Sequence, residues 1–369
     1  MASLVERATG GVGGWTDDDE EGWKAECGES YYADMLRDTT RNQAYIDGLE
    51  RAVAGAAASC PGGVSVLDIG TGTGLLAMMA QRAGATRTTA CECFAPVARA
   101  AAACLAANNL QERIKLVHKA STQMTLEDMQ DHHRADVIVN ELYDTELLGE
   151  GVLPTLRHAL AHLAAPSATV VPAAADVFAQ LLSSPALADG YNPSLARTPG
   201  GACLFPPPPA APDTSQDHGG TEWVVTAPAE SVFVDRLVAR GAGRGVGAAV
   251  AALSIDFCSP PSHGVHAAAP VTIHADRDAT VHAILFWWDL RMVKGDANPL
   301  TESPPRWGHG ATTTGGTAGG DRPFEGVLTM APGLGWRDHW RQNLCVLERP
   351  IQVRSEKGST SALWRTCTP

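Results

Sequence analysis

Short apolar runs alternate with stretches of helical spacing along the first half of the chain. The apolar runs predict buried strands at 64–69, 86–93, 114–118 and 136–140. The stretches between them predict helices at 30–59, 75–81, 96–108 and 152–163. Strands alternating with helices are typical of a parallel sheet that is covered on both faces. We therefore expect an α/β domain over residues 24–171, with helices ahead of its first strand.

The pattern changes near residue 171, where helical periodicity becomes weak. Short β-like runs follow at 176–182, 223–226, 271–274, 281–290, 326–330 and 343–347. They predict a mainly antiparallel β domain over 172–350, a barrel or sandwich. Stretches of low hydrophobic pattern predict flexible inserts at about 185–220 and 308–320. We expect a mobile acidic tail at 1–23 and a C-terminal extension at 351–369.

Four acids follow the predicted strand at 136–140: Glu141, Asp144, Glu146 and Glu150. Open α/β sheets bind their ligands beyond the carboxyl ends of strands, where these acids stand. Glu141 and Glu150 are nine positions apart, and a loop that doubles back could bring both carboxylates to one point. Paired carboxylates suit a guanidinium, a planar cation with several N–H donors. On this loop alone, a solvated acidic loop remains an alternative.

A glycine-rich turn stands between the first predicted strand and its helix. Glycine in such a turn lets the backbone approach a ligand at a helix N-terminus. The dinucleotide-binding pattern G-x-G-x-x-G would need a glycine at position 75, which is Leu75. The spacing of Gly70, Gly72 and Gly74 after Asp68 instead suits S-adenosylmethionine.

Three further features add candidate chemistry. Glu92 ends the second predicted strand, 22 residues after Gly70, where an acid can accept hydrogen bonds from both ribose hydroxyls; a surface acid is the alternative. Arg41 could pair with a carboxylate of the cofactor, or be an ordinary surface residue. Asp338, His339 and Trp340 lie in an aromatic-flanked turn, which is more often structural than catalytic.

Composition and charge narrow the function classes. The 369 residues are 44% hydrophobic and 19% charged, as in globular proteins. The net charge of −13 argues against nucleic acid as a main partner. No apolar run reaches about 18 residues, so we expect no membrane span, and the N-terminus lacks a signal-peptide core. Nine scattered cysteines favour a reducing intracellular compartment. The C-x-C at 91–93 has no second cysteine pair, so we expect no metal site.

The ordered set of motifs resembles the protein arginine methyltransferases. It comprises the glycine turn within 66–76, the acid Glu92, the loop 141–150 and the segment 336–340. The chain is most similar to the first module of the monomethylating, type III, tandem-module branch, through 30–36, 41–42, 144–147 and more loosely 286–289. Likeness is dense over about 24–180 and looser over 245–350.

This resemblance implies a Rossmann-like S-adenosylmethionine-dependent methyltransferase domain followed by a mainly antiparallel β-barrel domain. It implies methyl transfer to a guanidino nitrogen of arginine in proteins such as histones, giving monomethylarginine. The implied catalytic residues are Glu141, Glu150, Asp338 and His339. The implied cofactor-binding residues are Arg41, Asp68, Gly70, Gly72, Glu92 and, on the adenine side, Ser121. The implied substrate-binding residues are Asp144, Glu146 and Trp340.

The resemblance also sets expectations about assembly. The tandem-module relatives carry a second module that this chain lacks, so we expect a homodimer in its place, or else a fragment. A truncated half that binds cofactor or partner without turnover is the alternative function. A small-molecule methyltransferase would share the glycine turn but not the paired glutamates with the Asp-His-Trp segment. We expect arginine-rich protein partners, neither membrane nor nucleic acid, and a location in cytoplasm and nucleus.

Overall fold

The computed structural model describes residues 32–187, 221–222, 230–232, 237, 240–262, 271–298, 327–329, 340–355 and 362–364. The predicted tail at 1–23, the predicted strand at 223–226 and the insert at 308–320 lie outside the described residues. So does all but the first three residues of the insert predicted at 185–220, and those three form a helical turn.

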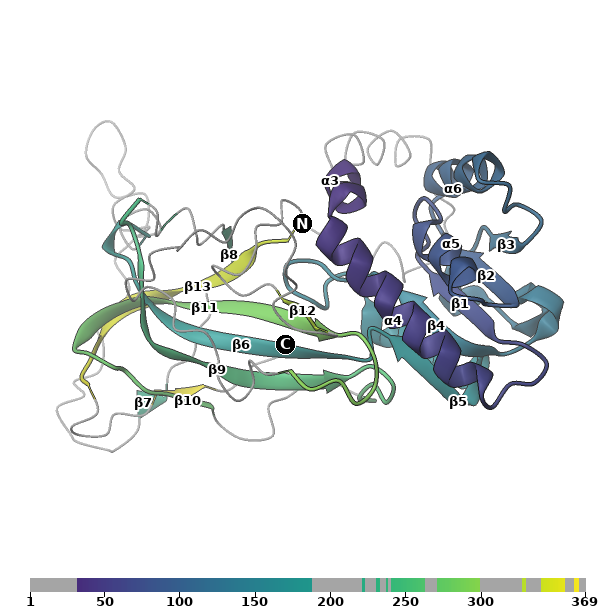
Figure 1. The fold of residues 1–369 in the computed structure, drawn as a ribbon. Coiled ribbons are helices and arrows are strands. Elements are labelled where there is room, and N and C mark those ends of the chain that lie inside the picture. Colours follow the sequence, from purple (N-terminus) through teal and green to yellow (C-terminus); the bar gives the residue numbers. More distant parts are fainter. Residues whose placement is uncertain are drawn as a thin grey trace.

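Five parallel strands form the sheet of the first domain (Figure 1). They are β1 (Ser65–Ile69), β2 (Arg87–Cys91), β3 (Ile114–Val117), β4 (Ala135–Asn140) and β5 (Ala164–Val171). Their order is β3-β2-β1-β4-β5, so the chain runs outward from β1 and then reverses at β4. Such a reversal opens a crevice at the carboxyl ends of the two central strands, β1 and β4.

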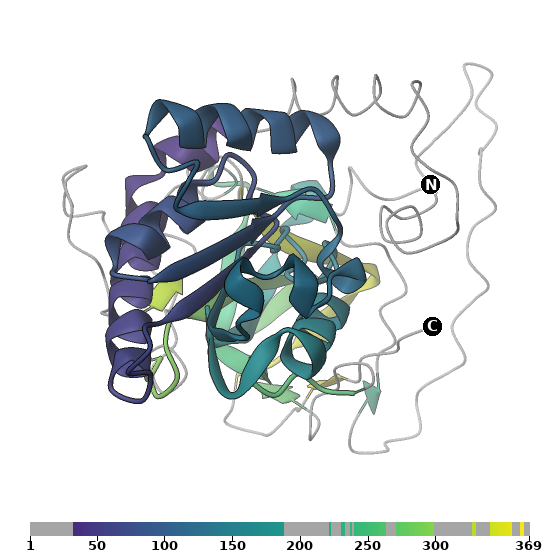
Figure 2. The same cartoon turned by 90° about the vertical axis from the view of Figure 1, so that its right-hand side faces the viewer.

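Helices cover both faces of this sheet. They are α3 (Tyr32–Arg37), α4 (Thr39–Ala57), α5 (Leu75–Arg82), α6 (Ala95–Ala107) and α7 (Val152–His162), with short 3-10 turns η1 (Ser121–Gln123), η2 (Leu126–Asp128) and η3 (Gln130–His132). Figure 2 shows α4, α5 and α6 on one side of the sheet and α7 with the 3-10 turns on the other. The Asp38 carboxylate caps α4 by accepting from the Arg41 backbone N–H at 2.8 Å, which fixes the start of this helix.

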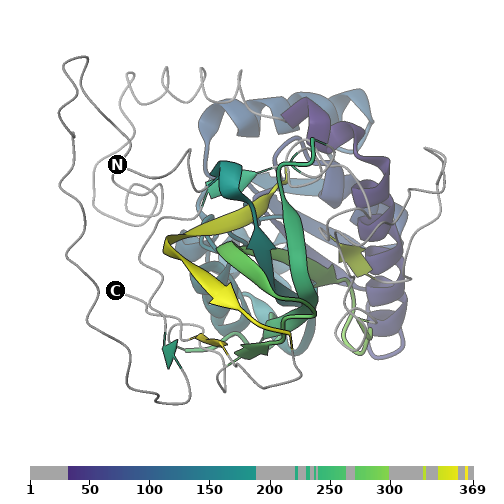
Figure 3. The same cartoon turned by 90° about the vertical axis from the view of Figure 1, so that its left-hand side faces the viewer.

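The second domain is built mainly from antiparallel strands (Figure 3). Its larger sheet contains β6 (Ala174–Ser183), β8 (Glu230–Val232), β9 (Arg244–Asp256), β11 (Ala279–Arg291), β12 (Val327–Thr329) and β13 (Gln342–Val353) in the order β8-β13-β11-β6-β9, with β12 pairing β11. A smaller sheet contains β7 (Thr221–Glu222), β10 (Val271–Ile273) and β14 (Ala362–Trp364) in the order β10-β14-β7. The predicted fold class, a parallel α/β domain followed by an antiparallel β domain, is confirmed.

The sequence analysis predicted no strand at the positions of β5, β7, β8, β9 and β14. β9 has the sequence RGVGAAVAALSID, in which alanine and glycine replace the branched residues that mark strands. β5 carries a proline and a serine in its first half, and it pairs regularly with β4 over its last three residues. The C-terminal extension predicted at 351–369 also contributes strands, because 351–353 complete β13 and 362–364 form β14.

The helix α4 joins the two domains (Figure 1). Its Arg51 makes two hydrogen bonds to the carboxylate of Asp296, at 2.5 and 3.1 Å. A side chain at Gly48 would meet Met292 at 3.1 Å and Val171 at 3.2 Å, so the helix and the β domain pack closely here. Among the helices that the structure describes, none is both long and apolar enough to cross a membrane.

Candidate active site

The glycine turn links the end of β1 to the start of α5. Gly70, Gly72 and Gly74 have positive φ angles of 69°, 57° and 85°, a region that residues with a Cβ adopt at a cost. The backbone N–H groups of Gly70 and Thr71 both donate to the carbonyl of Cys91, each at 3.0 Å. These bonds hold the turn against the end of β2, so the glycine turn expected from the sequence is present and its position is fixed.

Glu92 follows β2 and faces this turn. Its Oε2 accepts from the Gly72 backbone N–H at 3.1 Å, and its Oε1 accepts from the Phe94 N–H at 3.0 Å. The residue is 8% exposed, so the alternative of a surface acid is wrong. Burial raises the pKa of this carboxyl, while the backbone N–H donors oppose the rise. Each carboxylate oxygen can accept more than one hydrogen bond, so Glu92 can also accept from a hydroxyl of a ligand.

Asp68 lies in β1, two residues before the turn. The Thr71 hydroxyl donates to its Oδ2 at 2.5 Å, whereas Oδ1 has no hydrogen-bond partner among the described residues. Burial raises the pKa of this carboxyl to about 7, although the Thr71 bond lowers it. A buried acceptor without a partner is unusual in a folded protein, so this atom suits a donor from a bound ligand.

Arg41 and Glu141 form an ion pair between α4 and the end of β4. Arg41 Nη2 donates to Glu141 Oε2 at 2.9 Å, and the side chains are 6% and 11% exposed. The guanidinium also lies over the ring of Tyr45, 5.3 Å from its centroid. Burial raises the pKa of Glu141, and the Arg41 charge opposes this rise. The predicted surface alternative for Arg41 is wrong, and its partner in the structure is Glu141.

The loop that begins at Glu141 returns through a tight turn. The Gly149 backbone N–H donates to Asp144 Oδ1 at 3.1 Å, and a Cβ at Gly149 would overlap Asp144 Oδ2 at 1.9 Å. Asp144 therefore closes the loop, while Glu146 stands exposed on it. Neither contact tests the substrate-binding role that we predict for these two acids.

Glu150 ends the loop, and the negative charges of other acids in the loop shift the pKa of its carboxyl. Burial of its carboxyl, with the charges of Glu141 and Asp144, raises the pKa of Glu150 to about 8. Water still reaches the residue, which is exposed as a whole, and screens part of this repulsion. The charge of Glu141 thus contributes to the raised pKa of Glu150, and the meeting of the two carboxylates at one point stays a prediction.

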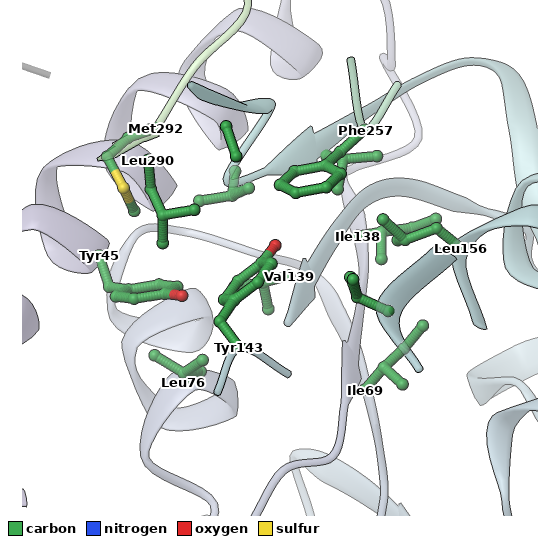
Figure 4. Packing of buried hydrophobic residues seen from close by; sticks show 14 of the residues in the cluster. Tyr45, Ile69, Leu76, Ile138, Val139, Tyr143, Leu156, Phe257, Leu290 and Met292 are labelled. Atoms are coloured by element: carbon green, nitrogen blue, oxygen red, sulfur yellow. The ribbon is translucent and has the colours of Figure 1, made fainter. Parts of the chain in front are cut away.

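The β domain holds the middle of this loop by its backbone. Trp340 Nε1 donates to the Tyr143 carbonyl at 2.8 Å. Trp288 Nε1 donates to the carbonyls of Asp144 at 3.1 Å and Thr145 at 3.2 Å. Asn343 Nδ2 donates to the Thr145 carbonyl at 2.7 Å. Figure 4 shows Tyr143 between Tyr45 of α4 and Phe257, with which its ring stacks at 5.5 Å. The sequence analysis did not assign Trp288 or Asn343 to the site. Asn343 follows Arg341 and Gln342 at the start of an apolar run, so its sequence context gave no signal of this role.

The glycine turn and the acid loop meet at the crevice between β1 and β4. Ile69 pairs with Asn140, so Gly70 and Glu141 leave adjacent strand ends. A Cβ at Gly70 would lie 2.8 Å from Leu142 Cδ2, which puts the two predicted motifs in direct contact. Ser121 is buried at the start of η1. Asp338 and His339 lie outside the described residues, and within these no group of three or more His, Cys, Asp or Glu could hold a metal ion.

Comparison with known proteins agrees with this geometry. Residues 46–148, which include the turn and most of the loop, match the family described as ribosomal protein L11 methyltransferase (PrmA). Protein arginine N-methyltransferase 7 of Drosophila yakuba is 32% identical over 342 residues, which cover 91% of this chain. The protein of the same name from Anopheles gambiae is 34% identical over 352 residues, which cover 92%. The chain is similar to one half of a protein arginine N-methyltransferase.

The extent of this likeness is part of the result. The chain spans about half the length of these arginine methyltransferases, 46% and 48% respectively. A solved structure described as the Trypanosoma brucei PRMT1 enzyme-prozyme heterotetrameric complex with AdoHcy superposes with a TM-score of 0.63 at 18% identity. It covers 89% of this chain and 85% of that chain, so both domains share the arginine methyltransferase fold.

Proposed function

We propose that the chain is an S-adenosylmethionine-dependent protein-arginine methyltransferase, or the catalytic half of one. The observation that carries this proposal is the contact between the glycine turn and the acid loop, made where Gly70 approaches Leu142. It sets a nucleotide-type turn beside a carboxylate that already binds a guanidinium, that of Arg41. The sequence likeness to arginine methyltransferases supports the same conclusion.

The residues of the turn fit such a cofactor. Gly70 and Gly72 leave the backbone bare, Glu92 retains acceptor capacity for ribose hydroxyls, and Asp68 Oδ1 is a buried acceptor without a described partner. Arg41 remains our proposed contact for the cofactor's carboxylate, and Ser121 for its adenine side. When bound, S-adenosylmethionine supplies a methyl group on an electron-poor sulfur.

The acid loop would bind and orient the arginine of the substrate. A guanidinium has a pKa above 12 and no lone pair free for attack, so orientation and charge must lower the barrier. Glu141 and Glu150 together can draw positive charge onto the nitrogens that they bind, which leaves the third nitrogen less delocalised. Orientation of this kind can contribute up to roughly 7–11 kcal/mol. We propose that Asp338 and His339 assist Glu141, and that Trp340 borders the substrate.

We further propose monomethylarginine as the product and arginine-rich proteins such as histones as substrates. Asp144 and Glu146 add negative charge beside the clamp formed by Glu141 and Glu150, which would favour segments with several arginines. We also propose that the chain assembles into a homodimer and that it acts in cytoplasm and nucleus. The net charge of −13 supports basic protein partners rather than nucleic acid.

Mass spectrometry of an arginine-rich peptide tests this function. The chain, incubated with S-adenosylmethionine, should add one methyl group to arginine, and the same peptide with lysine at each arginine should stay unmodified. Size-exclusion chromatography of the same sample identifies which oligomer is active. Cofactor binding without methylation in any oligomeric state would instead favour a binding module.

The rate of methyl transfer should rise with pH. The clamp needs an ionised Glu150, whose pKa is raised to about 8, so the competent form accumulates as pH increases through this value. We expect kcat/KM to climb between pH 7 and 9 in the wild type. Glu150→Gln, which has no proton to lose there, should show low activity without this rise. A profile that is flat for the wild type over the same interval would contradict the assignment.

A further inference from the structure

Trp288 and Asn343 stand outside the acid loop, yet they bind its backbone. Both belong to the β domain, on the neighbouring strands β11 and β13. Their N–H groups reach the carbonyls of residues 144 and 145, which lie between the two glutamates of the clamp. No sequence motif that we identified assigns either residue a role in the site.

Strand register explains why both side chains reach the same loop. Asn343 pairs with Phe286 across the two strands, so their side chains project from the same face of the sheet. Trp288 is two positions beyond Phe286, and alternate residues of a strand share a face. Trp287 must then point the other way, and its ring stacks on Phe178 at 5.6 Å.

The two donors sit in a rigid setting. Trp288 is 2% exposed, and its ring packs edge-on against the ring of Trp340 at 4.9 Å. Asn343 is also buried. The carbonyls of residues 144 and 145 thus accept hydrogen bonds from side chains whose positions are fixed by the folded sheet. The α/β domain anchors the start of the loop instead, through the Arg41–Glu141 pair.

We propose that Trp288 and Asn343 are positioning residues that set the distance between the Glu141 and Glu150 carboxylates. The β domain thereby holds the clamp in its substrate-binding shape, without touching the substrate through these residues. This inference rests on the proposed methyltransferase function for its effect on rate. Its structural part, that these donors hold the loop, can be tested without turnover.

The test compares two indole deletions on adjacent positions. Trp288→Phe keeps an aromatic ring but removes the N–H that binds the loop, whereas Trp287→Phe removes an N–H that has no hydrogen-bond partner in the described structure. Asn343→Leu removes the second donor and keeps the number and branching of the side-chain heavy atoms. Hydrogen exchange of the Leu147 and Gly149 amides reports on the loop, and methylation kinetics with a cofactor-binding measurement report on the site.

We expect faster exchange of the loop amides in Trp288→Phe and Asn343→Leu, but not in Trp287→Phe. In the same two variants, kcat/KM should fall on the order of 10²-fold, since a misplacement near 1 Å can have this effect. Cofactor affinity should stay within about twofold of wild type, because its proposed contacts lie on the glycine turn; a general loss of structure would lower both.

Every other outcome overturns either the positioning role or the proposed function. Unchanged loop exchange in Trp288→Phe and Asn343→Leu overturns the positioning role, whatever the activity. Faster exchange with wild-type kcat/KM overturns it as well, since the loop would then tolerate the movement. A wild-type protein that binds S-adenosylmethionine but methylates no arginine peptide sinks the proposed function instead, and the exchange data alone then decide whether the β domain holds the loop.

Discussion

Replacing Glu141 with glutamine should nearly abolish methyl transfer. The substitution keeps the size of the side chain but removes the charge that binds a guanidinium at 2.9 Å in the structure. Removing one partner of a buried ion pair costs about 3–5 kcal/mol. If that loss falls on the transition state, kcat/KM decreases on the order of 10²- to 10⁴-fold, at tenfold per 1.36 kcal/mol. Steady-state kinetics with an arginine-rich peptide measure this directly.

The same substitution leaves Arg41 buried without its carboxylate, so stability must be measured beside activity. Thermal unfolding of Glu141→Gln shows whether the loss is one of folding. Glu141→Asp keeps the charge but shortens its reach, and should retain folding better than activity. Glu112→Gln, which neutralises an exposed acid outside the site, should match the wild type. Near-wild-type kcat/KM in a folded Glu141→Gln protein would rule out the clamp.

Much of the α/β domain could be predicted because its signals are local. The run 64–69 is apolar except for Ser65 and Asp68, and its strand is fully buried in the structure. The positive φ angles at Gly70, Gly72 and Gly74 favour glycine, so the turn can be recognised from the spacing of its glycines. β9 could not be predicted in the same way, because its alanines and glycines are held by pairing with β6, from which they are far apart in sequence.

The candidate site also contains residues that the sequence predicts and residues that it does not. Asp68, Gly70, Glu92 and Glu141 could be predicted because each stands at the end of a strand, where topology fixes what a side chain can reach. The partners of the loop depend on the register of β11 and β13, which spacing within one segment does not specify. Trp288 was therefore not assigned to the site, although it is a buried hydrogen-bond donor to the loop.

Replacing Gly70 with alanine should impair both motifs of the site at once. A φ of 69° costs a residue with a Cβ roughly 1–2 kcal/mol, and the new methyl group would lie 2.8 Å from Leu142 Cδ2. Leu142 packs against the core and is bonded directly to Glu141, so its displacement moves the clamp. We expect weaker cofactor binding and a decrease in kcat/KM on the order of 10²-fold. Calorimetry and peptide methylation measure the two effects.

Gly84→Ala provides the matched control, because Gly84 also has a positive φ, of 100°, but no atom lies within 4 Å of the added Cβ. It should lose a similar free energy of unfolding, about 1–2 kcal/mol, and keep its activity. The double variant Gly70→Ala with Leu142→Ala removes the overlapping side chain and should recover part of the lost rate. Equal activity in Gly70→Ala and Gly84→Ala would mean that backbone strain alone acts at Gly70. The turn and the loop would then work independently, and their contact could no longer carry the proposed function.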